Sequence, residues 1–86
     1  PKANPDFDKE IDLVSQWLLE FEDEDSIPNR EIGLSSKNKA LMKMPYKNNY
    51  GYWSDNSLTY SDFKKSFSVL PVNEGLFNKK WKEVLM

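Results

Sequence analysis

The fold is decided by residues 30–44, which read REIGLSSKNKALMKM. The two ends of this stretch, Arg30–Leu34 and Ala40–Met44, carry its apolar residues, and the five residues between them are all polar. Two short apolar runs separated by a polar loop of this length are typical of an antiparallel β-hairpin. We expect the second strand to end before Pro45, because proline lacks the amide hydrogen that a central strand needs.

The residues before the hairpin carry two conflicting patterns. Phe7, Ile11, Val14 and Leu18 recur at helical spacing, whereas the aromatic and aliphatic residues from Trp17 onward stand at every second position, as in a strand. A helix that continued to residue 25 would place a run of carboxylates at its negative end. We therefore predict a helix over residues 5–15 and a strand over residues 17–22, with a helix over 16–22 as the alternative.

The residues after the hairpin predict one short strand and two helices. The strand is expected at residues 50–53, after an asparagine-rich turn. The first helix, residues 60–69, begins at a pattern that resembles a capping box, Thr59 to Asp62, and presents Tyr60, Phe63, Phe67 and Leu70 on one face. The second helix, residues 74–85, is capped by Asn73 and turns Phe77, Trp81, Val84 and Leu85 inward.

These elements together predict an α+β fold. Residues 1–86 are expected to form a single small globular domain, in which an antiparallel sheet is packed by an N-terminal helix and two C-terminal helices.

The composition argues against catalysis. The 86 residues include no cysteine and no histidine, which removes the usual nucleophile pairs, thiol redox chemistry and Cys/His zinc sites. The alternating acids at 6, 8, 10 and 12 are not a calcium loop, because Ile11 and Trp17 stand where such a loop needs glycine and glutamate. We expect no catalytic, cofactor-binding or metal-binding residues, and we expect the protein not to be an enzyme.

The net charge of −2 is unevenly distributed along the chain. Residues 1–30 carry nine acids and three bases, a balance of −6, and residues 31–86 carry five acids and nine bases, a balance of +4. The acids are densest in a short run that we predict to bind a basic partner or to serve as a solvated turn. This run consists of Glu20, Glu22, Asp23, Glu24 and Asp25.

A second candidate surface is aromatic. Tyr46, Tyr50, Tyr52 and Trp53 are interleaved with lysines and asparagines. Such rings serve as core residues, as anchors of a protein interface, or as stacking platforms for single-stranded nucleic acid. The negative net charge disfavours nucleic acid, so we predict that these residues contribute to the core and to a protein interface.

The segments WLLEFEDED (17–25), REIGL (30–34), KMPYKNNYGYWSDN (43–56) and LTYSDF (58–63) resemble parts of small uncharacterised bacterial proteins. Some of those proteins are immunity proteins, which neutralise a secreted toxin. The resemblance implies an opening strand followed by an acidic turn, and a toxin domain as the partner.

The sequence thus predicts a non-catalytic, cytoplasmic protein-binding domain of the immunity type, whose partner is a basic toxin domain. No membrane segment and no signal peptide are visible. Two alternatives stay open: a nucleic-acid-associated protein that uses the Lys/Tyr-rich C-terminal half, and a small structural domain of a phage or bacterial assembly.

Overall fold

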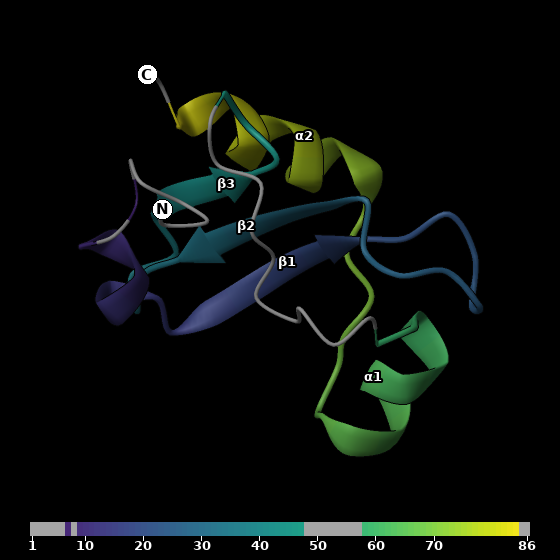
Figure 1. Cartoon of the computed structure of the whole chain (residues 1–86). Coiled ribbons are helices and arrows are strands. Elements are labelled where there is room, and N and C mark those ends of the chain that lie inside the picture. The colour runs from purple at the N-terminus through teal and green to yellow at the C-terminus, as the bar shows by residue number, and fades with distance from the viewer. Residues whose placement is uncertain (1–6, 8, 48–57, 85–86) are drawn as a thin grey trace.

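The computed structural model describes residue 7 and residues 9–47 and 58–84 (Figure 1). A 3-10 turn, η2 (Glu10–Leu13), leads into three strands, β1 (Gln16–Glu20), β2 (Arg30–Leu34) and β3 (Ala40–Met44). Two helices follow, α1 (Tyr60–Ser66) and α2 (Glu74–Glu83). This order confirms the α+β class, while the strand expected at 50–53 lies outside the described residues.

The three strands form one antiparallel sheet in the order β1-β2-β3. The predicted hairpin is confirmed, and both of its strands have the predicted bounds. In the polar loop between them, the Ser35 hydroxyl accepts hydrogen bonds from the backbone of Lys37 and Lys39, and Asn38 adopts a φ of 64°. The strand expected at 17–22 is shifted slightly, since it starts at Gln16 and ends at Glu20.

The N-terminal helix predicted at residues 5–15 is wrong. In the described part of this segment the chain makes a 3-10 turn at Glu10–Leu13 and is extended from Val14 onward. The Ser15 amide donates to the Leu34 carbonyl (2.8 Å), and a Cβ built on Gly33 would meet the side chain of Val14. The end of this segment pairs with the hairpin instead of forming a helix, because a short helix containing β-branched residues and aspartates has little stability of its own.

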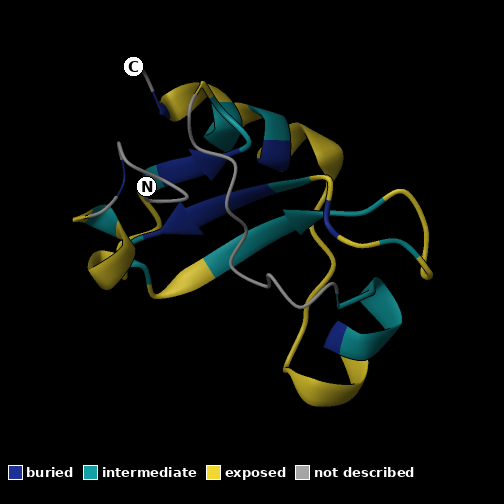
Figure 2. Ribbon diagram, viewed as in Figure 1, coloured by how far each residue is buried: buried dark blue, intermediate teal, exposed yellow. Residues whose placement is uncertain are grey.

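The core is centred on β2 and β3, which are mostly buried, whereas β1 is intermediate to exposed (Figure 2). Ile32, Met42 and Met44 are completely buried, and Phe7, Phe77 and Val84 pack in the same cluster. Gly33 is required in this layer, because an added Cβ would lie 2.7 Å from Val14 Cγ2 and 2.9 Å from Met42 Cγ.

Helix α1 has the predicted start but a different end. Thr59 and Asp62 form a reciprocal capping box, as the sequence indicates. The helix stops at Ser66, because the following Val69-Leu70-Pro71 run favours extended backbone over helix. Phe63 is buried, but Phe67 is 43% exposed and Leu70 is 87% exposed, and both lie beyond the end of the helix, so the predicted single face of four apolar residues is wrong at its C-terminal half.

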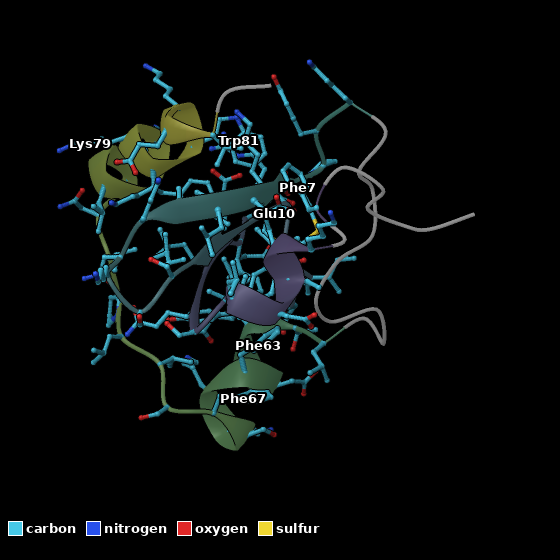
Figure 3. All side chains as sticks on the ribbon, turned by 90° about the vertical axis from the view of Figure 1, so that its left-hand side faces the viewer. Phe7, Glu10, Phe63, Phe67, Lys79 and Trp81 are labelled. Atoms are coloured by element: carbon cyan, nitrogen blue, oxygen red, sulfur yellow. The ribbon has the colours of Figure 1, made fainter. Side chains whose placement is uncertain are left out.

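Helix α2 packs beside β3, over the sheet face that carries Arg30 and Lys43 (Figures 1 and 3). The Asn73 side chain caps its first turn by accepting from the Leu76 amide (2.7 Å). Phe77 is buried and Trp81 lies on the side of the sheet, whereas Lys79 points away from it (Figure 3). The helix ends at Glu83, two residues before the predicted end, and Leu85 lies outside the described residues.

Candidate functional site

The acidic run forms a defined turn between β1 and β2. We call residues 21–26 the acidic turn. The Asp23 carboxylate accepts from the Asp25 amide (2.9 Å), and the Ser26 hydroxyl both accepts from the Asp23 amide (3.0 Å) and donates to the Asp23 carbonyl (2.8 Å). Short polar side chains thereby fix the backbone of the turn, which is their usual role in such loops.

Helix α1 supports the acidic turn through hydrogen bonds to the backbone of the turn. The amide and the hydroxyl of Ser61 both donate to the Glu24 carbonyl (3.1 Å each), and the Tyr60 amide donates to the Ser26 carbonyl (3.2 Å). Phe21 packs its ring against those of Tyr60 and Phe63, with centroids 5.1 and 5.7 Å apart. The carboxylates are therefore presented on a preorganised support.

Glu20 is engaged in an internal ion pair. Its carboxylate accepts two hydrogen bonds from Arg30, directly opposite on β2, and the Nε–Oε1 distance is 2.8 Å. The guanidinium also lies 4.8 Å from the ring centroids of both Phe77 and Trp81. The hydrogen bonds from Arg30 lower the pKa of Glu20, and those to Glu20 raise the pKa of Arg30. These contacts give Glu20 a structural task, and its role in partner binding stays a prediction.

The other four acids differ in how they are compensated. Glu24 forms a salt bridge with Lys64 of α1 (2.8 Å), and this hydrogen bond raises the pKa of Lys64. Glu22, Asp23 and Asp25 are exposed, and none of them forms a salt bridge with a residue that the structure describes. The acidic turn therefore presents to solvent three carboxylates that no described lysine or arginine compensates.

An open groove of about 910 Å³ lies beside the acidic turn. Residues 17–24 form one wall and residues 68–74 form the other, and the groove is also lined by Asn29, Tyr60, Phe63 and Phe77. The second wall is apolar and exposed: Val69 is 39%, Leu70 87% and Val72 48% exposed. Sequence reasoning missed this wall because it placed Leu70 on one apolar face of the predicted helix, although Pro71 directly after it indicates extended chain.

Of the aromatic candidates, the structure describes only Tyr46; Tyr50, Tyr52 and Trp53 lie outside the described residues. The ammonium of Lys43 lies 4.2 Å from the centroid of the half-buried Tyr46 ring and 4.9 Å from that of Trp81, and it donates to the Trp81 carbonyl (2.9 Å). Burial, with a smaller effect of Lys47, lowers the pKa of Lys43. Tyr46 follows β3 and so lies at the same end of the sheet as the acidic turn, but at the opposite edge.

Other kinds of site find no support in the described ranges. Within residues 7, 9–47 and 58–84, no three acidic, histidine or cysteine side chains come together as metal ligands. None of the helices in that same part of the chain is long and apolar enough to cross a membrane. Comparison with protein-family models, curated proteins and solved structures found no significant match. The functional conclusion therefore depends on the surface of the molecule itself.

Proposed function

We propose that this protein is a non-catalytic, cytoplasmic binding protein that captures a basic protein through the acidic turn and the adjoining groove. One observation carries the proposal: three uncompensated carboxylates stand on a hydrogen-bonded support directly beside an exposed apolar wall. Charged residues next to an apolar groove are the usual composition of a protein interface.

The two halves of this surface supply different parts of the binding. Like charges packed as closely as Glu22, Asp23 and Asp25 repel one another, and a basic partner relieves that repulsion. The same charges accelerate encounter with a cationic protein. Leu70 and Val72 are apolar groups that lose water when a partner covers them, which favours a long-lived complex.

The resemblance of residues 17–63 to toxin-immunity proteins suggests that the partner is a bacterial toxin domain. Toxins that cut nucleic acid are often basic, because they bind a polyanion, and an acidic inhibitor suits such a surface. We therefore propose that the protein acts as an immunity protein for a basic bacterial toxin domain. This role explains the acidic turn without requiring any catalytic group.

The test uses the protein encoded next to this one in its genome, which is the expected toxin. Its association rate is measured by stopped-flow or biolayer interferometry at low salt, with the variant Glu22→Lys/Asp25→Lys. We expect the rate to fall at least about tenfold, since steering accounts for one to three orders of magnitude. Asp23 is left intact because its carboxylate holds the turn.

The matched control is Glu10→Lys/Asp12→Lys, which changes the net charge equally at the opposite end of β1. We expect this control to change the rate much less. An equal loss in both variants would reduce the effect to net charge alone and would contradict a site at the acidic turn. A rate that is unchanged in the turn variant would contradict it as well.

A nucleic-acid role has less support, because Lys43 and Lys47 already approach the Tyr46 ring, at 4.2 and 5.4 Å from its centroid. A salt-sensitive mobility shift of single-stranded DNA, lost on Tyr50→Ala, would favour that alternative over a protein partner.

A further inference from the structure

The groove beside the acidic turn extends from the sheet face near Phe77 to the open edge of β1. Its sheet-side wall consists of consecutive residues, 17–24. Side chains of a strand alternate between the two faces, so a groove over one face would be lined by every second residue. Lining by consecutive residues shows that the groove includes the open side of β1 as well as the face near Phe77.

The backbone of β1 offers hydrogen-bonding groups to this groove. The Glu20 carbonyl accepts from the Asn29 amide (2.6 Å), so Glu20 turns its backbone groups toward β2. In an antiparallel strand the neighbouring residues turn theirs the other way, which directs those of Leu19 and Phe21 into the groove. Among the described residues, none outside β2 forms a backbone hydrogen bond with Leu19 or Phe21.

The far wall suits an extended occupant. Residues 68–73 form neither a helix nor a strand, and they pass from α1 to α2 near the C-terminal end of β1 with the side chains of Leu70 and Val72 exposed (Figure 1). At one end of the groove stand the carboxylates of Glu22 and Asp23. An occupant that fits this channel is extended, carries apolar side chains toward Leu70 and Val72, and bears lysine or arginine near the acidic turn.

We infer that the basic partner contributes a β-strand that pairs with the open edge of β1 and fills the groove. This inference rests on the proposed function and specifies how the partner is held. Strand addition is a recurring mode of protein recognition, in which the main chain supplies affinity and alternate side chains supply specificity. The strand β1 is five residues long, roughly 17 Å, and its C-terminal part at Leu19 continues into the acidic turn, where a partner strand can pair.

The test uses a defined probe, the peptide acetyl-KVKVKVK-amide, titrated into the ¹⁵N-labelled full chain and followed by NMR and amide hydrogen exchange. We expect salt-sensitive binding that slows exchange of the Leu19 and Phe21 amides, while the Glu20 amide changes little. Two control peptides carry N-methyl groups on the valines or on the lysines. In a paired strand, either the valine amides or the lysine amides of the peptide face β1. Methylation of the set that faces β1 should weaken binding roughly tenfold, and methylation of the other set should leave binding almost unchanged.

The outcomes separate this inference from the proposed function. Suppose the peptide shifts the signals of Glu22 and Asp25 but leaves exchange at Leu19 and Phe21 unchanged, or binds equally with either methylation. Strand addition is then overturned, and the acidic surface remains a binding site. Failure of the peptide to bind at all also overturns strand addition, and the kinetic experiment with the neighbouring gene product decides the proposed function independently.

Discussion

Substitution of Gly33 by alanine tests the packing argument for the sheet with a single methyl group. The added Cβ would lie 2.7 Å from Val14 Cγ2 and 2.9 Å from Met42 Cγ, both closer than real Cβ contacts. The side chain of Val14 is β-branched and restricted at χ1, and its backbone is held by the neighbouring Ser15–Leu34 hydrogen bond, so Val14 cannot easily move away from the added methyl group. Either Val14 or Met42 has to shift within the core.

The expected magnitude follows from two opposing terms. Overpacking of a core costs about 1–3 kcal/mol. Alanine regains about 0.4–1 kcal/mol by restricting the unfolded chain, because Gly33 does not have a positive φ. The net loss of stability is about 1–2 kcal/mol, which corresponds to a decrease in Tm of about 4–16 °C for a domain of this size.

Thermal and urea denaturation followed by circular dichroism measure this loss. Gly75→Ala is the matched control: its Cβ would meet only the Asn73 side chain, at 3.3 Å, and an alanine inside α2 should be neutral or stabilising by up to about 1 kcal/mol. In a Val14→Ala background the cost of Gly33→Ala should fall by about half, since the closest contact is gone. A neutral Gly33→Ala variant, or an equal cost in both backgrounds, would refute the reasoning.

Two further predictions concern charged residues. Glu20→Gln should lower the free energy of unfolding at pH 7 by up to about 1 kcal/mol in urea titrations. Because the folded protein lowers the pKa of Glu20 below its usual 4.5, this difference should be full above pH 4.5 and vanish as the pH falls through the folded pKa; a constant difference down to pH 2 would contradict it. For Lys43, burial lowers the pKa below 10.5, so the folded chain binds its proton less tightly than the unfolded chain. Wild-type stability should therefore rise relative to Lys43→Met as the pH rises through the folded pKa toward 10.5, and parallel pH profiles would exclude this role.

The parts of the fold that sequence predicts correctly are those set by local interactions. The hairpin of β2 and β3 needs only two apolar runs and a polar loop, and both helix caps are encoded within four residues. The N-terminal helix fails because its competitor is not local: Val14 and Ser15 contact Gly33 and Leu34, about twenty residues further on. The helical periodicity of residues 7–18 reflects local sequence only, so it does not reveal the competing contacts with the hairpin.

The candidate site was visible in the sequence only as a dense run of acids. Which of those acids are compensated depends on distant partners, such as Arg30 for Glu20 and Lys64 for Glu24. The apolar wall lies more than forty residues after the acidic turn, and its position depends on where α1 ends. Composition identified the charge of the surface, and tertiary structure identified its shape.

The topology separates the acidic turn from two of the lysines in the described part of the chain. In an antiparallel meander the β1–β2 turn and the β2–β3 loop lie at opposite ends of the sheet, so the acidic turn is separated from Lys37 and Lys39 by the length of a strand. Five residues span roughly 17 Å, about twice the Debye length of roughly 8 Å at physiological ionic strength. Screened at that distance, these lysines cannot offset Glu22, Asp23 and Asp25, and Lys64 is already paired with Glu24. Since no described lysine or arginine forms a salt bridge with Glu22, Asp23 or Asp25, a basic partner can neutralise them, and its binding at this surface should weaken steeply as salt is added.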